Sequence, residues 1–241
     1  MQTPTPRVRT GSRSAQVAAE LGRRIVGRVY PPESTLPAEA TLLDEFGISR
    51  TVLRDAVKSL ESKGLIEARQ RRGTCVTTRE RWNMLDGEVL GWVAQSGADP
   101  QLLIRLTELR LIVEPGACAL AARNASEAAL QRIEAAFDRM VDGVDDRNAF
   151  VEADREFHTA LLMAADNEYL GSICTAIAAA LTVSLRATNS TGRSNRASLP
   201  AHQRIVAALR RRDGPAAAEL SRIQLEEAKQ RLRTGARSNK R

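Results

Sequence analysis

The chain has only two histidines, and one of them follows an acidic residue at a spacing that suits metal chelation. Asp154 and His158 are four residues apart in VEADREFHTALL, so on a helix both side chains leave the same face. A carboxylate and an imidazole placed in this way can hold one divalent ion together with ligands from other helices. The same spacing is also typical of a simple hydrogen-bonded or ion pair, so spacing alone leaves both interpretations open.

Arg110 and Glu114 form a second pair one helical turn apart, in LTELRLIVEPG. As a surface ion pair it would contribute roughly 0.2–0.5 kcal/mol. Alternatively, Arg110 faces a pocket and binds the carboxylate of an acidic ligand, because a guanidinium group matches a carboxylate in two parallel hydrogen bonds. Arg186, from a later predicted helix, is a second candidate for this role.

Charge is distributed unevenly along the chain. Residues 1–79 carry 14 basic and 8 acidic residues, residues 80–228 carry 16 and 21, and residues 229–241 carry six basic residues and no acidic one. A basic head on an acidic body is expected when one domain binds nucleic acid phosphates and the other does not.

The basic head has the pattern of three short helices. The first begins at Ser14 and buries a stripe that runs from Val17 to Val29, and the second begins at Pro37. Ser49 caps a third helix that Gly64 ends. The polar face of this third helix carries Arg50, Thr51, Arg54 and Lys58, in the arrangement that places side chains in the major groove of DNA.

Two short strands, 65–68 and 74–77, are predicted to follow the third helix and to enclose a basic tip, Arg69 to Gly73. Gly73 allows the backbone to approach a groove closely, and the arginines Arg69, Arg71 and Arg72 suit a narrow minor groove. A solvated hairpin is the alternative, but its position directly after the three helices favours a DNA-binding wing.

Residues 14–79 resemble the N-terminal domain of GntR-type regulators of the fatty-acid-regulator-like subfamily, in LPAEATLLDEFGISRTVLRDAVKSLESKGLIEARQRRGTCV. The resemblance implies that Ser49, Arg50, Thr51 and Arg54 contact bases and phosphates in the major groove. It also implies that Arg72 and Gly73 lie at the minor groove. Ala40 departs from the family, where many members have an arginine that contacts DNA.

Residues 80–234 are predicted to be entirely helical. The fold class is therefore mainly α: a winged helix-turn-helix over 14–79, followed by an antiparallel all-helical bundle over 80–234 for ligand binding and dimerisation. Residues 1–13 are expected to be a disordered arm, and 235–241 a basic disordered tail. The helices are expected at about 82–95, 100–123, 127–141, 147–165, 168–187, 198–212 and 215–233.

The segments LTELRLIVEPGACALAA, DREFHTALL and AHQRIVAALRRRD resemble the helical ligand-binding domain of the same subfamily. Its metal-binding members use an Asp, a His four residues later and two further His. Asp154, His158 and His202 match the first three, and Gln224 stands in the fourth position. The resemblance implies a divalent metal, zinc first, with Arg110 and Gln224 beside the effector.

RWNMLDGEVLGWV, residues 81–93, resembles the linker helix of galactonate-operon repressors and related sugar-acid regulators. The resemblance implies a sugar acid such as D-galactonate as the effector. Its two Trp residues are expected to anchor this linker helix rather than to touch ligand.

The function expected from these features is that of a cytoplasmic, homodimeric repressor. A carboxylate effector would release it from double-stranded operator DNA, and the missing signal peptide and membrane span argue against a membrane partner. The same regulator with a different organic acid is the first alternative. A non-specific architectural DNA binder is another. A metal-dependent enzyme is the least favoured, because neither a nucleophile motif nor a general base accompanies the Asp and His residues.

Overall fold

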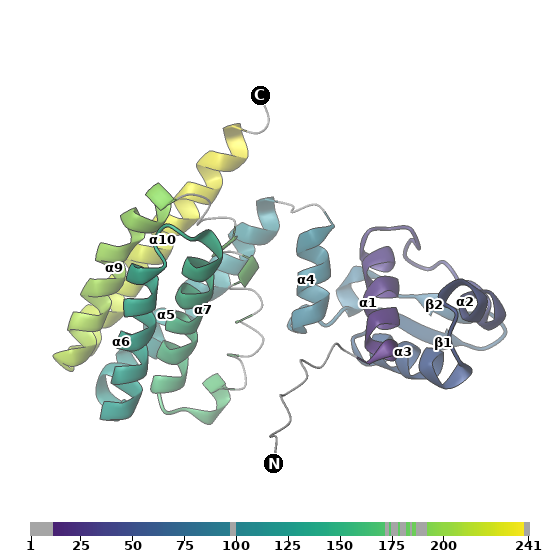
Figure 1. The fold of residues 1–241 in the computed structure, drawn as a ribbon, viewed down its shortest axis with the longest axis horizontal. Coiled ribbons are helices and arrows are strands. Elements are labelled where there is room, and N and C mark those ends of the chain that lie inside the picture. The colour runs from purple at the N-terminus through teal and green to yellow at the C-terminus, as the bar shows by residue number, and fades with distance from the viewer. Residues whose placement is uncertain are drawn as a thin grey trace, which may run out of the picture. The chain divides into compact units, whose positions relative to one another are not determined.

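The computed structural model describes residues 12–96, 100–171, 174, 178, 182–183, 185–186 and 192–238. The chain divides into two compact units, Met1–Gly97 and Ala98–Arg241, and each is described by itself. Residues 1–11 of the predicted arm, 239–241 of the predicted tail and half of the predicted helix 168–187 lie outside the described residues. Figure 1 shows the helices of both units and the small sheet of the first.

The first unit begins with α1, Arg13–Val26. Ser12 caps it by accepting a hydrogen bond from the Ala15 N–H, so the cap lies two residues before the predicted Ser14. The predicted stripe is buried as far as Ile25. Val29 is exposed instead, because the helix ends at Val26 and Arg28 adopts a left-handed φ of 62° that turns the chain away.

The second and third helices are α2, Glu39–Phe46, and α3, Arg50–Ser62. Gly47 ends α2 in the left-handed region, at φ 57°, which glycine adopts without steric cost. Ser49 then caps α3 by accepting from the Val52 N–H, as the sequence predicted. The apolar face of α3 is buried at Leu53, Ala56 and Leu60.

The wing consists of two antiparallel strands, β1 Ile66–Arg69 and β2 Gly73–Val76. Arg69 pairs with Gly73, so the turn is confined to residues 70–72 and is shorter than the predicted tip. The Leu36 N–H donates to the Thr74 carbonyl at 2.8 Å. This bond fixes the wing to the segment that leads into α2.

A short 3-10 turn, η1 Arg79–Arg81, leads to α4, Gly87–Gln95, in place of the single helix predicted over 82–95. α4 packs against α1, and a Cβ added at Gly22 would lie 2.3 Å from the Trp92 ring. The Lys63 ammonium contacts Asp86 at 2.7 Å and Glu88 at 2.8 Å. The first unit therefore extends through α4, beyond the boundary predicted after residue 79.

The second unit is a bundle of long helices: α5 Pro100–Asn124, α6 Glu127–Asp142, α7 Arg147–Ala164, α9 Gly192–Arg210 and α10 Gly214–Ser238. Short loops join α5 to α6, α6 to α7 and α9 to α10. α5 packs along α10, α6 along α7, and α9 along α10 (Figure 1). α9 begins six residues before its predicted start and runs through Pro200, and the added residues include the buried Asn195.

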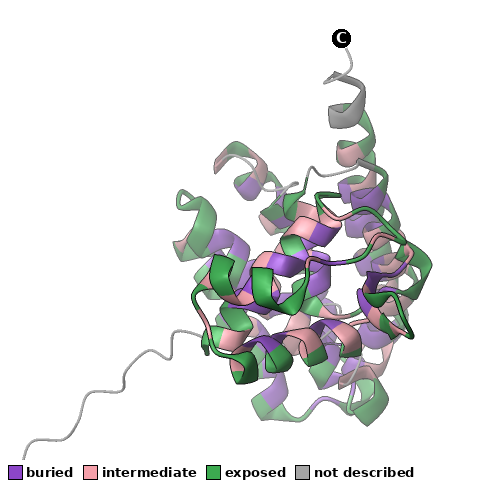
Figure 2. Ribbon diagram, turned by 90° about the vertical axis from the view of Figure 1, so that its right-hand side faces the viewer, coloured by how far each residue is buried: buried purple, intermediate pink, exposed green. Residues whose placement is uncertain are grey.

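Buried and exposed residues alternate along the helices, as the colours of Figure 2 show. Ile133, Met140, Phe150, Phe157 and Leu161 are among the buried side chains that α6 and α7 contribute to the core. Within the described ranges, no helix is long and apolar enough to cross a membrane.

Candidate functional site

The first candidate surface lies on α3. Arg50, Thr51 and Arg54 are exposed there, directly after the Ser49 cap. Arg50 makes a long ion pair with Glu39 at 3.6 Å, and both side chains are at least half exposed. Because such exposed pairs are worth about 1 kcal/mol or less, Arg50 can exchange Glu39 for a phosphate or a base.

The wing carries the second part of this surface. Arg71, Arg72 and Gly73 are exposed, and Arg71 adopts the left-handed region at φ 60°. Arg69 differs from them, because its guanidinium is half-buried and binds Glu67 at 2.7 Å. Arg69 thus forms an ion pair within β1, although the sequence placed it in the tip of the wing.

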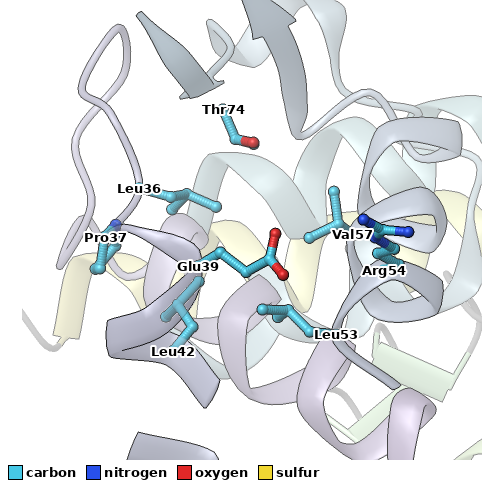
Figure 3. A pocket seen from close by; sticks show the side chains of 8 residues that line it. All are labelled: Leu36, Pro37, Glu39, Leu42, Leu53, Arg54, Val57 and Thr74. Carbon is cyan, nitrogen blue, oxygen red and sulfur yellow. The ribbon is translucent and has the colours of Figure 1, made fainter. Parts of the chain in front are cut away.

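A hollow of about 140 Å³ separates α2, α3 and β2. Leu36, Leu42, Leu53 and Val57 are among its lining residues, the Glu39 carboxylate points into it, and Arg54 lies at its edge (Figure 3). Drug-sized ligands occupy cavities of roughly 300–1,000 Å³, so this hollow is too small for such a ligand.

The second candidate site is a buried polar cluster inside the helical unit. It joins side chains from four helices, each at most 7% exposed: Arg110 and Glu114 on α5, Asp154 and His158 on α7, His202 on α9, and Gln224 on α10. Burying charged groups is costly unless they are paired and hydrogen-bonded. The structure brings together the pairs Arg110–Glu114 and Asp154–His158, which the sequence presented separately.

The ring of His202 is held so that one nitrogen faces the cluster. Its Nδ1 lies 2.9 Å from the Ser198 carbonyl, which can only accept, so Nδ1 carries the proton. Its Nε2 lies 2.7 Å from the Gln224 amide nitrogen, which donates to it, and 3.1 Å from Asp154 Oδ1.

His158 presents the same nitrogen. Arg110 Nη2 lies 3.1 Å from His158 Nε2, and a guanidinium can only donate, so this Nε2 is an acceptor. The other nitrogen, Nδ1, lies 2.9 Å from Glu114 Oε2, at a poorer angle than a regular hydrogen bond. His158 Nε2 also lies 3.2 Å from Asp154 Oδ1.

Three electron-pair donors thus converge on one point: Asp154 Oδ1 and the Nε2 atoms of His158 and His202. Ligand atoms of these three residues all lie within 4.8 Å of one another. The two nitrogen lone pairs and the carboxylate oxygen are all electron-rich, so they repel one another unless a cation lies between them. The buried Gln224 Oε1 has no hydrogen-bond partner among the described residues and adds one more oxygen that a cation can attract.

The electrostatics of the cluster favour positive charge between these donors. Burial opposes the ionisation of Asp154, but its close contacts with the imidazole rings of His158 and His202 hold its pKa well below the usual range. Burial likewise opposes ionisation of Glu114, but the charge of Arg110 and the contact with His158 lower its pKa to about 2. The pKa of His158 is raised, because Glu114 and Asp154 outweigh burial and the repulsion by Arg110.

One predicted effector residue lies elsewhere. The Arg186 side chain is exposed, and its backbone carbonyl accepts a hydrogen bond from Arg147 at 2.7 Å. Conversely, the contact of Glu114 with His158 and that of Ser198 with His202 were missed from the sequence. The signal for Glu114 was its position as a charged residue within the apolar run LIVEPGACAL.

A winged helix with exposed arginines on its third helix, joined to a helical bundle with a buried polar cluster, defines a class: ligand-responsive, DNA-binding transcriptional regulators. The chain belongs to the gntR family of bacterial regulatory proteins, whose model matches residues 13–76. An FCD domain matches residues 105–227 and contains the whole buried cluster.

Several characterised proteins are similar over most of their length. The galactonate operon transcriptional repressor of Escherichia coli K12 is 35% identical over 93% of this chain and 98% of its own. The transcriptional repressor NanR of Citrobacter rodentium is 29% identical over 85% of this chain and 79% of its own. The solved structure of the Listeria monocytogenes protein Lar has the same fold, with a TM-score of 0.69 at 19% identity over 94% of this chain and 99% of that one.

Proposed function

We propose that the protein is a homodimeric repressor that senses a sugar acid of the D-galactonate type in its helical unit. The observation that carries the proposal is the buried cluster, in which Arg110 lies 3.1 Å from a nitrogen of the candidate metal-binding set. The likeness to the galactonate operon repressor, which covers 93% of this chain, supports a sugar acid over other carboxylates.

Asp154, His158 and His202 would hold a divalent metal ion, with zinc as the first candidate. The residues fit such an ion, because two lone pairs and one carboxylate oxygen converge there and Gln224 Oε1 lacks a partner. When bound, the metal supplies a Lewis-acidic centre that attracts an oxygen anion. The chain's own contribution is to exclude water, to fix both imidazole rings and to place Arg110 beside them.

Arg110 would bind the effector carboxylate. Its guanidinium is buried and is held by Glu114 at 2.6 Å, so little side-chain entropy remains to be lost on binding. The exposed Ser49, Arg50, Thr51 and Arg54 would contact bases and phosphates in the major groove, and Arg71, Arg72 and Gly73 would lie at the minor groove. Effector binding would lower the affinity of the dimer for its operator.

The test is calorimetry on the chelator-stripped full chain, titrated first with zinc and then with D-galactonate, gluconate and citrate. We expect zinc binding in the wild type, its loss in Asp154→Ala, and D-galactonate binding in the zinc-loaded wild type. Asp138→Ala, which changes an exposed acid on α6, is the control and should bind both.

A DNA fragment from upstream of the protein's own gene provides the functional readout. D-galactonate should release the wild-type protein from it, but not Arg110→Gln. Binding of citrate alone would replace the sugar acid by another carboxylate, and the absence of zinc binding would remove the metal from the proposal. Affinity equal to that for random DNA would indicate an architectural binder, and zinc-dependent turnover of the acid would indicate an enzyme.

A further inference from the structure

Arg110, Glu114 and His158 form a closed triangle of contacts at one side of the candidate metal-binding set. Glu114 Oε1 accepts from Arg110 Nε at 2.6 Å, Glu114 Oε2 lies 2.9 Å from His158 Nδ1, and Arg110 Nη2 donates to His158 Nε2 at 3.1 Å. All three side chains are buried. One carboxylate therefore contacts both the proposed effector-binding arginine and a proposed metal ligand.

Glu114 determines which nitrogen of His158 faces the cluster. A carboxylate at Nδ1 keeps the proton on that nitrogen and leaves the Nε2 lone pair available, which is the usual role of an acid behind a metal-binding histidine. His202 obtains the same tautomer from the Ser198 backbone carbonyl, at 2.9 Å. Both histidines thus adopt the Nδ1–H tautomer. In His158 a side chain that can be replaced holds it, whereas in His202 a backbone carbonyl does.

Glu114 also determines where Arg110 remains when a cation arrives. The Nη2 group of Arg110 uses the same His158 lone pair that a metal ion would need. A metal ion would displace Arg110 Nη2 from His158 Nε2. The hydrogen bond from Arg110 Nε to Glu114 Oε1 uses other atoms and would remain. The freed N–H would stay beside the metal, where it can donate to a carboxylate.

We infer that Glu114 is a positioning residue that couples the two ligands, by fixing His158 for the metal and by holding Arg110 for the effector carboxylate. The inference rests on the proposed function. It adds that the metal and the effector would each strengthen the binding of the other. By linkage, the factor must be the same in both directions.

The first experiment measures the tautomers directly, by two-bond proton–nitrogen correlation spectra of the metal-free full chain labelled in its histidines. The chain has two histidines, so His202 is an internal control for His158. We expect the Nδ1–H tautomer for both, and a shift of His158 alone toward Nε2–H in Glu114→Gln. Glu108→Gln, an acid on α5 that pairs with Lys229, should change neither. His158 in the Nε2–H form in the wild type, or unchanged in Glu114→Gln, would overturn the inference.

The second experiment measures coupling, with cobalt(II) followed by its visible absorption and D-galactonate followed by calorimetry. In the wild type, saturating cobalt should raise galactonate affinity at least tenfold, and galactonate should raise cobalt affinity by the same factor. Glu114→Gln should lose about 10–100-fold in cobalt affinity, with the coupling factor falling toward one. If Glu114→Gln does not fold, the double variant Arg110→Gln, Glu114→Gln removes both charges together, and its cobalt affinity should fall by the same factor of about 10–100. Wild-type cobalt affinity in the double variant would overturn the inference.

The outcomes separate this inference from the function on which it rests. Wild-type cobalt affinity and coupling in Glu114→Gln would overturn the role of Glu114 and leave the sensing of a sugar acid intact. If the wild type binds neither cobalt nor galactonate, the proposed function and the coupling both fail, and the histidine spectra still decide whether Glu114 holds His158.

Discussion

The arginines proposed to bind DNA and the arginine proposed to bind the effector lie in opposite surroundings. Arg50, Arg54 and Arg71 are exposed, and Arg50 makes a long ion pair with Glu39. Arg110 is 2% exposed and contacts both Glu114 and His158. A polyanion can be bound by many exposed charges of small individual value, whereas a small acid must be recognised by a few desolvated groups. The second strategy concentrates stability and function in the same side chains.

The largest expected effect tests that concentration. Arg110→Ala leaves Glu114 without its guanidinium partner, so we expect a loss of about 3–5 kcal/mol in the free energy of unfolding. The matched control is Arg139→Ala, which breaks an exposed ion pair with Glu156 in the same unit and should cost about 1 kcal/mol or less. Urea unfolding followed by circular dichroism measures both. Equal losses would break the comparison between buried and exposed arginines.

On the DNA-facing side, we expect Arg54→Ala to weaken binding to the upstream fragment by about 1–3 kcal/mol and to relax base preference. Arg71→Ala should weaken binding to any sequence and lower the salt slope by about one. Neither should change the free energy of unfolding by more than about 0.5 kcal/mol, because both side chains are exposed. Electrophoretic mobility shifts at several salt concentrations measure these effects, with Arg132→Ala on α6 as the control. A large loss of stability in Arg54→Ala would contradict the division of roles.

Gly22→Ala tests whether apolar packing holds the first unit together. The added methyl would meet the Trp92 ring at 2.3 Å, so we expect a loss of about 1–3 kcal/mol in the free energy of unfolding. Gly91→Ala in α4 meets nothing within 4 Å and should be neutral or stabilising by about 0.5–1 kcal/mol. Thermal melting of both variants measures the difference. If Gly22→Ala melts like the wild type, α1 and α4 are not in firm contact.

The smallest expected effect concerns Asp86, which shares the Lys63 ammonium with Glu88. Burial opposes its ionisation, but the hydrogen bond and charge of Lys63, together with hydrogen bonds from the Val89 and Glu88 N–H groups, outweigh burial and lower the pKa of Asp86. A lowered pKa adds stability above the unfolded-state pKa, and that stability is lost as pH falls through the folded-state pKa. Asp86→Asn keeps a cap on α4 and should cost about 1 kcal/mol or less at neutral pH. The difference in free energy of unfolding between the wild type and Asp86→Asn should shrink in acid. Urea unfolding at several pH values measures it, and a difference that does not change with pH would contradict a role for the ion pair.

Local features were predictable from the sequence, and contacts between distant residues were not. Ser49 and Gly47 act within one helical turn, so their residue types determine the ends of α2 and α3. Asp154 and His158 share a face for the same reason. The contact of Glu114 with His158 joins positions 44 residues apart, and no spacing rule reaches that far. His202 entered the set through family resemblance, and the structure adds Ser198 as the group that orients its ring.

The domain boundary could not be placed from the sequence for a similar reason. The chain becomes helical after the wing, and composition does not reveal that α4 packs back onto α1. The packing depends on the absence of a side chain at Gly22, which a helical pattern does not reveal. Arg69 was assigned to the wing tip by its neighbours, although its own contact with Glu67 removes it from the tip.

The packing of Trp92 on Gly22 also means that intrinsic tryptophan fluorescence can report on the first unit. The two tryptophans of the chain, Trp82 and Trp92, both lie in the first unit, and both are buried. Indole emission therefore senses the surroundings of two side chains of the first unit. A change in that emission when a sugar acid is added would show, without any label, that a signal from the helical unit has arrived at the DNA-binding unit.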